Sequence, residues 1–140
     1  MPLELFIAAS ERLNPTEQGR PSPVLVRIYG LNQRGFFTSA DYFALLGSGG
    51  LPGNGEVVDV EEFMLMPGEV RVIRRRAALD VRFIGVAAGY RDVGESVWRA
   101  IAAVPAPHRA GRLWARDSSP VRKYSLMIGE RAVVIEESEE

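Results

Sequence analysis

Cysteine is absent from this chain of 140 residues. Its absence excludes disulfide bonds, thiolate metal ligands and a cysteine nucleophile. The compartment stays open, because many periplasmic proteins lack cysteine too. Histidine occurs once, as His108 in a proline-rich segment with no acidic cluster beside it, which favours a solvated loop residue over a general base. No Gly-x-Ser-x-Gly turn is present to supply a serine nucleophile.

Long apolar runs are also absent, since none approaches the ~20 residues that span a bilayer. The first residues lack the basic and then apolar pattern of a secretory signal, although a signal removed earlier stays possible. The net charge is -1, so no global field attracts nucleic acid or anionic lipid. The composition is 46% hydrophobic and 25% charged, which indicates one globular domain over residues 1–140.

What the sequence does contain is a series of short apolar runs with a period of two, separated by glycine, proline and polar residues. The pattern predicts an all-β fold of seven or eight strands, either a barrel or a two-sheet antiparallel β-sandwich. The expected strands are 3–9, 24–29, 57–65, 69–76, 81–90, 97–104, 121–128 and 132–137. Pro67-Gly68 predicts a turn, Gly129-Glu130 predicts a type II′ hairpin, and the acidic tail 136–140 is expected to fray.

One short helix, at about 39–46, interrupts the strands. Ser39 is expected to cap it, with Asp41 in its first turn. A glycine-rich loop follows and runs to Gly55. It resembles a phosphate-binding loop only superficially, because it lacks the Gly-Lys-Ser/Thr ending and contains Pro52.

The remaining polar candidates have plainer interpretations than catalysis. Asp59 and Glu61 share a strand face, which predicts a solvent-facing stripe. The run 74–76 is three arginines whose side chains alternate between faces, so a solvated strand end is favoured. Tyr90 and Trp98 are expected between the sheets, each followed by an outward-facing arginine. We therefore expect no catalytic residue, metal or cofactor.

Five segments, in this order and spacing, resemble a known family. They are Asn14-Pro15-x-x-x-Gly19-Arg20-Pro21-Ser22-Pro23-Val24-x-Val26-Arg27-x-Tyr29-x-Leu31, Asp41-Tyr42-Phe43-Ala44-Leu45, Pro67-Gly68-Glu69, Gly85-Val86-Ala87-Ala88-Gly89-Tyr90-Arg91-Asp92 and Trp98-Arg99. Together they cover nearly the whole chain. The chain resembles the outer-membrane lipoprotein of the bacterial type VI secretion system, the TssJ (SciN/VasD-like) family.

The resemblance implies a transthyretin-like sandwich with an added helix and no enzymatic activity. It also implies a place at the periplasmic face of the outer membrane, through a lipid on a cysteine upstream of the first strand. The implied partner is the periplasmic C-terminal region of the inner-membrane protein TssM. Neither the signal nor the cysteine is in this sequence. The simplest explanation is that the sequence starts just after them; if Met1 is the natural start, the membrane role does not follow.

Strand order predicts which loops lie together. In an antiparallel sandwich, the loops after odd-numbered strands gather at one end, here 11–22, 65–69, 91–96 and 129–131. The N-terminus, the helix and the loop with His108 are expected at the other end. The loop 11–22 is long for a strand connection and contains several prolines. The resemblance implicates it in partner binding, and we assign that role to Leu13, Asn14, Gln18 and Arg20.

Two other functions stay open on the sequence. A transthyretin-like sandwich could carry a small apolar ligand, which would require a roomy apolar pocket. An enzyme of unrecognised type would require a cleft that brings His108 beside carboxylates.

Overall fold

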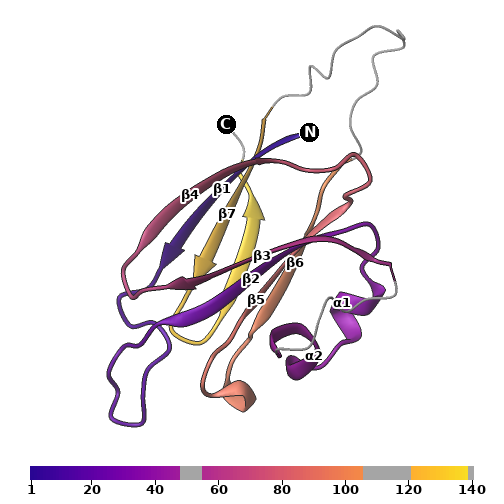
Figure 1. The fold of residues 1–140 in the computed structure, drawn as a ribbon. Helices are drawn as coiled ribbons and strands as arrows, with labels where there is room; N and C mark the ends of the chain where they lie inside the picture. Colours follow the sequence, from indigo (N-terminus) through magenta and orange to yellow (C-terminus); the bar gives the residue numbers. More distant parts are fainter. Residues whose placement is uncertain (48–54, 106–120, 139–140) are drawn as a thin grey trace, which may run out of the picture.

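The computed structural model describes residues 1–47, 55–105 and 121–138, in which the strands form two facing sheets (Figure 1). The first sheet has the strand order β4-β1-β7-β8 and the second has the order β3-β2-β5-β6. The first consists of β1 (Pro2–Ala9), β4 (Val70–Arg76), β7 (Arg122–Ile128) and β8 (Val133–Glu137). The second consists of β2 (Val24–Leu31), β3 (Val57–Leu65), β5 (Phe83–Ala88) and β6 (Arg99–Ala103).

The two-residue period of the sequence places the core between the sheets. Leu5 and Ile7 of β1 are fully buried, whereas Phe6 between them is exposed. On β5, Ile84 and Val86 belong to the same buried cluster. The predicted sandwich is confirmed in the described residues, with short helices added to eight strands.

One pairing departs from a purely antiparallel arrangement. β1 pairs with β7 in parallel, although every other ladder is antiparallel in the described part of the chain. Successive strands run in opposite directions between the two ends of the sandwich. Both β1 and β7 are odd-numbered, so they run in the same direction. Because these two odd-numbered strands are neighbours, the first sheet is mixed.

The helix predicted at about 39–46 is instead two short helices, α1 (Gly35–Ser39) and α2 (Tyr42–Leu46). Asp41, not Ser39, is the N-cap of α2, because its carboxylate accepts a hydrogen bond from the backbone N–H of Ala44 at 2.8 Å. Ser39 ends α1, and its hydroxyl donates to the Gly35 carbonyl at 2.7 Å. The extended backbone of Ala40 separates the two helices.

These helices lie on the outer face of the second sheet rather than at the N-terminal end of the sandwich (Figure 1). Phe37 of α1 packs edge-on against Tyr29 of β2, with ring centroids 5.6 Å apart. The Tyr29 hydroxyl donates to the carbonyl of Leu45 in α2. One outer face of the sandwich is thus covered by the chain itself.

The prediction that Trp98 fills the space between the sheets is only partly right. Trp98 is half-buried and packs against both the inter-sheet core and the core beneath the helices. Its ring lies 5.3 Å from that of Tyr42 in α2 and 4.6 Å from the guanidinium of Arg99. Arg99 does face outward, as predicted, but it is not free in solvent. It donates to the carbonyls of Phe37 (3.1 Å) and Ala40, and so holds the end of α1 on the sheet.

Arginines join the edge strands of the two sheets, β3 and β4. Arg75 lies 2.7 Å from an oxygen of Asp59 and 3.0 Å from an oxygen of Glu61. Arg71 donates to the carbonyl of Met64 at 3.3 Å. The expectation of a solvent-facing acidic stripe is therefore wrong, because both carboxylates pair with Arg75. The same pairs show that Arg75 is not part of a solvated strand end.

Two further predictions are wrong near the C-terminus. Gly129 does not have the positive φ of a type II′ turn, and the loop is four residues long because Ile128 pairs with Val133. Residues 136 and 137 of the tail belong to β8 and are not frayed. His108 and residues 48–54 of the glycine-rich loop lie outside the described residues.

We expect Gly85→Ala to destabilise the fold. A Cβ at Gly85 would lie 2.7 Å from the buried ring of Phe37, so the helix-covered face would have to open. Overpacking of this kind costs about 1–3 kcal/mol, measurable by urea denaturation. Gly94→Ala is the control, because nothing lies within 4 Å of a Cβ there. Equal effects of the two substitutions would contradict the packing described here.

Candidate partner-binding site

Four loop segments meet at the end of the sandwich opposite the N-terminus (Figure 1), and we call them the loop end: 10–23, 66–69, 89–97 and 129–132. Backbone hydrogen bonds join them. Ser10 donates to the carbonyl of Ile128 at 2.9 Å and accepts from Gly68 at 3.1 Å. The predicted gathering of these loops is therefore confirmed.

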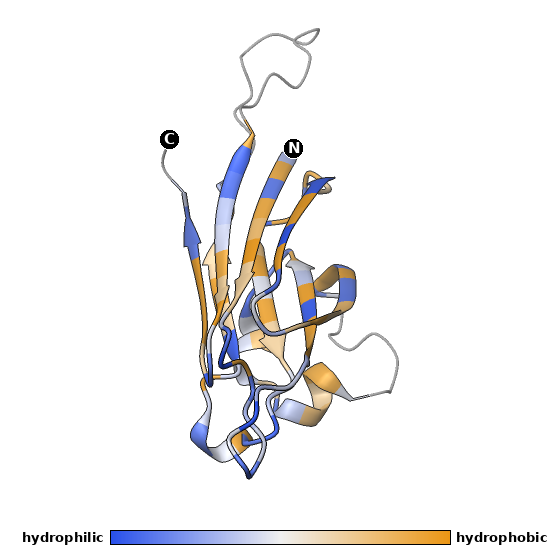
Figure 2. Ribbon diagram, turned by 90° about the vertical axis from the view of Figure 1, so that its left-hand side faces the viewer, coloured by the Kyte–Doolittle hydropathy of each residue, from blue (hydrophilic) through white to orange (hydrophobic). Residues whose placement is uncertain are grey.

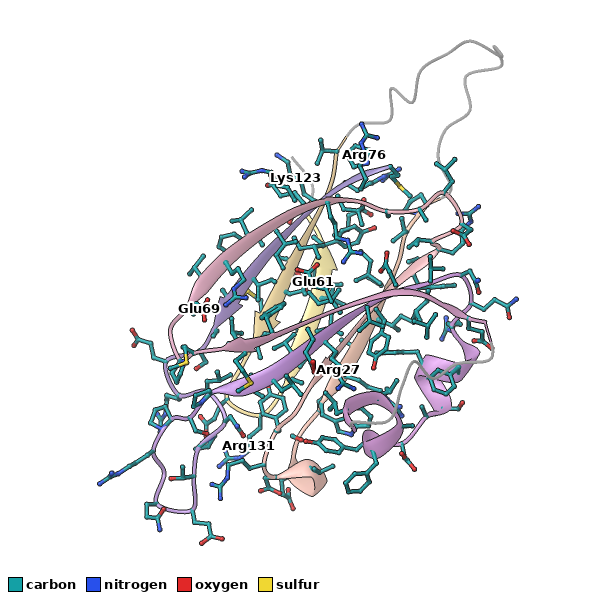
Figure 3. All side chains as sticks on the ribbon, viewed as in Figure 1. Arg27, Glu61, Glu69, Arg76, Lys123 and Arg131 are labelled. Carbon is teal, nitrogen blue, oxygen red and sulfur yellow. The ribbon has the colours of Figure 1, made fainter. Side chains whose placement is uncertain are left out.

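Both ends of the sandwich carry cationic side chains (Figure 3). Arg76 and Lys123 lie at the end with the termini, and Arg131 lies at the loop end (Figure 3). From the side, the loops opposite the termini are largely hydrophilic (Figure 2). The N-terminus itself is held in place, because its ammonium donates to the Ala77 carbonyl at 3.2 Å.

Asn14 is the centre of the loop end. Its amide nitrogen donates to the Pro23 carbonyl at 2.9 Å, and its amide oxygen accepts from the backbone N–H of Arg91 at 2.9 Å. Its own N–H donates to the Glu130 carbonyl at 3.1 Å, and its carbonyl accepts from the Ser22 hydroxyl. Asn14 is only 4% exposed and has a φ of 45°, a conformation that asparagine tolerates better than most residues. Through its side chain and its backbone, this one residue thus joins three loops.

The tip of the 10–23 loop is a compact turn. Thr16 donates its N–H to the Arg20 carbonyl at 2.8 Å, and its hydroxyl accepts from the N–H of Arg20 at 3.2 Å. Gly19 has a φ of 78° within this turn, and glycine can adopt this value without a steric penalty because it has no Cβ. Glu17, Gln18 and Arg20 are exposed around it. The tip therefore presents polar side chains on an ordered backbone.

The turn at 66–69 has the features of type II, with Pro67 and then Gly68 at a φ of 77°. The Glu69 carboxylate accepts from the N–H of Met66 at 2.9 Å and from Arg71 at 2.7 Å. These two donors hold the pKa of Glu69 below its usual range. The turn is thereby fixed beside the 10–23 loop.

Tyr90 fastens the β7–β8 loop to the rest of the loop end. Its hydroxyl lies 2.8 Å from the carbonyl of Gly129 and 3.0 Å from that of Ala132. Burial raises the pKa of Tyr90 well above that of a free tyrosine, so the hydroxyl stays protonated and able to donate. The loop is four residues long partly because Ala132 also forms a parallel bridge with Val97.

The four residues assigned to partner binding divide into two pairs. Gln18 and Arg20 lie at the exposed tip, where a partner can reach them. Leu13 is fully buried in the core and Asn14 is nearly so, which makes them supports of the loop rather than contacts. The sequence does not indicate the role of Tyr90 as a support, because the carbonyls that its hydroxyl bonds lie about forty residues further along the chain.

In the part of the chain that the structure describes, no group of three or more histidine or acidic side chains could hold a metal ion. Within the same ranges, no helix has the length and hydrophobicity to cross a membrane.

The space between the sheets is too small for a carried ligand. It is lined by residues such as Leu5, Ile28 and Ile84 and measures about 10 Å³, roughly the room of one water molecule. A larger hollow of about 440 Å³ lies on the surface, beside Glu4 and the arginines 74–76. Its lining combines four charged residues with Pro2, Leu3 and Val121, and it is open to solvent, so it is not the enclosed apolar pocket that the carrier hypothesis requires.

The described residues thus define a β-sandwich domain whose ordered polar loops gather at one end, on the kind of rigid scaffold that commonly positions binding loops. The family model for the type VI secretion lipoproteins VasD, EvfM and TssJ matches residues 1–128. The chain belongs to this family, and it is a structural, non-enzymatic lipoprotein of the type VI secretion system. A comparison with curated protein sequences gives no match.

Solved structures agree with this assignment. The type VI lipoprotein TssJ1 from Pseudomonas aeruginosa is 28% identical, with a TM-score of 0.86 over 100% of this chain and 98% of that one. A chain of a structure described as a type VI membrane complex is 26% identical, with a TM-score of 0.71 over 96% and 97%. A chain of a structure described as the TssM C-terminal domain (869–1107) from EAEC is 27% identical, with a TM-score of 0.66 over 96% and 99%.

We expect Asn14→Ala to loosen the loop end. The substitution removes both side-chain hydrogen bonds and leaves the Pro23 carbonyl and the Arg91 N–H without these partners. The two losses together should lower the free energy of unfolding by about 2–5 kcal/mol. Asn32→Ala is the matched control, because Asn32 makes one exposed hydrogen bond, to the Gly55 carbonyl, and should cost less than about 1.5 kcal/mol. Urea denaturation of both variants measures the difference. Equal losses would mean that Asn14 does not hold the loops.

Proposed function

We propose that this chain tethers the type VI membrane complex to the outer membrane by binding the periplasmic C-terminal region of TssM. A lipid on a cysteine upstream of β1 holds the N-terminal end at the periplasmic face of that membrane. The loop end then projects into the periplasm and carries the binding site.

The observation that carries this proposal is the Asn14 network. It fixes the 10–23 loop at the end of the sandwich away from the N-terminus, so an anchor and a partner can be engaged together. The prolines of the loop, including Pro15 and Pro21, further restrict its backbone. A loop ordered before binding loses less conformational entropy when the partner arrives.

The comparisons support the choice of partner. Two of the similar structures are described as a type VI membrane complex and as the TssM C-terminal domain. At the tip of the loop, Gln18 and Arg20 offer amide and guanidinium donors, and the guanidinium can bind a carboxylate through two parallel hydrogen bonds. Leu13 and Asn14 contribute by holding that tip in place.

Removing the tip side chains is expected to weaken partner binding. For Gln18→Ala combined with Arg20→Ala, we expect the Kd for the cognate periplasmic TssM fragment to rise at least tenfold, about 1.4 kcal/mol. Isothermal titration calorimetry would measure it.

Arg74→Ala is the control for this experiment. It also removes one positive charge, but from the C-terminal half of β4, near the end of the sandwich that holds the N-terminus, where Arg74 pairs with Glu4 at 3.0 Å. Its Kd should match that of the unaltered protein. If the tip variant binds as tightly as this control, the tip is not the contact.

The anchor is tested in cells with the complete gene, including its natural upstream sequence. We expect the protein in the outer-membrane fraction after density-gradient separation. Replacing the upstream cysteine with serine should move it to the soluble periplasmic fraction. A gene product that has no such cysteine, or that stays soluble when it is present, would contradict the tether.

A further inference from the structure

The outer face of the first sheet carries an apolar surface that no part of the described chain covers. Side chains at outward positions of neighbouring strands align in rows, as the register shows. One row crosses all four strands and is apolar throughout; the next, formed by Phe6 and Val72, is apolar on two strands. We call these six residues the apolar face: Phe6, Ala8, Val70, Val72, Met127 and Val134. Apart from Ala8, they are 42–59% exposed.

The position of this face is defined at both ends. Towards the termini the next outward row is charged, with Glu4 paired to Arg74 and flanked by Lys123. Towards the other end, Val70 directly follows the 66–69 turn, and Met127 lies one residue before β7 ends at the 129–132 loop. The apolar face is therefore continuous with the loop end and separated from the N-terminus by charge.

The contrast with the second sheet shows that this exposure is not a general property of the fold. There, α1 and α2 bury the outward residues, so that Leu31 and Ala87 are fully inaccessible. The first sheet has no corresponding cover within residues 1–47, 55–105 and 121–138.

We propose that the apolar face is the second half of the TssM-binding surface and receives an uncharged, aliphatic surface of the same partner that contacts the loop tip. This inference rests on the proposed function. It adds the location of a second contact surface on this chain and the chemistry by which that surface holds the partner. Burial of aliphatic side chains supplies affinity that the polar tip alone does not.

Area decides against a second copy of this chain as the occupant. With strands ~4.8 Å apart and ~3.3 Å per residue, two rows over four strands span at most roughly 250 Å². A stable dimer buries about 800 Å² on each partner. The face reaches that size only when it is combined with the adjoining loops, and this favours one partner that covers both.

Location decides against lipid. A bilayer that holds the N-terminal anchor lies at the end with Arg76 and Lys123 (Figure 3). The row with Glu4 and Arg74 would have to enter the apolar phase before Phe6 or Val72 could.

The test places a lysine in the apolar face. For Val72→Lys and for Met127→Lys, we expect the Kd for the cognate periplasmic TssM fragment to rise at least tenfold. Leu79→Lys is the matched control, because Leu79 is 58% exposed at the N-terminal end, and its Kd should not change. Thermal unfolding confirms that each variant is folded. Val72→Thr keeps the β-branched shape and should raise the Kd two- to fivefold if Val72→Lys does not fold.

The outcomes separate this inference from the proposed function. If the tip variant weakens binding but the apolar-face variants equal Leu79→Lys, the inference is overturned and the proposed function stands. If the unaltered protein does not bind the fragment, both fall. If it sediments as a dimer that Val72→Lys dissociates, a second copy occupies the face and the inference is overturned.

Discussion

The order of the loop end depends on one buried asparagine, Asn14. Asn14 satisfies groups from its own loop, from the β5–β6 connection and from the β7–β8 loop, and it does so almost completely out of water. A buried polar group contributes to order only when each of its hydrogen bonds is made, because an unmade one costs the full desolvation penalty. The side-chain amide of Asn14 has a partner at its nitrogen and at its oxygen, and its backbone N–H bonds the β7–β8 loop, so the three segments are held as one unit.

The loop end can stay ordered only if the two sheets beneath it stay together. A sandwich has four exposed sheet edges, and edges are where strands separate or pair wrongly. On one side, Arg75 joins β4 to two carboxylates of β3. On the other, a bridge between Val97 and Ala132 ties the two sheets beside β6 and β8. The arginine and the two carboxylates that might have suggested catalysis thus hold the two sheets together along one edge.

The sequence predicted what local periodicity controls and missed what distant partners decide. Alternation located all eight strands and the core face of β5, and strand order located the loop end. Asn14 next to a proline is typical of a surface turn, and nothing local indicates that Arg91, far along the chain, makes it a buried support. Gly129 likewise looked like a two-residue turn, because the bridge of Ala132 to Val97 is invisible to local pattern. Ser39 and Asp41 are both good caps, and only the extended Ala40 between them decides that Asp41 starts the second helix.

The two sheets divide the work of the molecule. The outer face of the second sheet is covered by α1 and α2. Phe37 and Leu45 of these helices form a second buried cluster with residues of β2, the strand that follows the 10–23 loop, and this packing stiffens that strand. The first sheet contains β1, which runs from the N-terminus to that same loop, and β7 alongside it in parallel. The proposed anchor before β1 and the proposed contact at the loop end would therefore lie at opposite ends of one strand, and that strand is paired on both sides, with β4 and with β7.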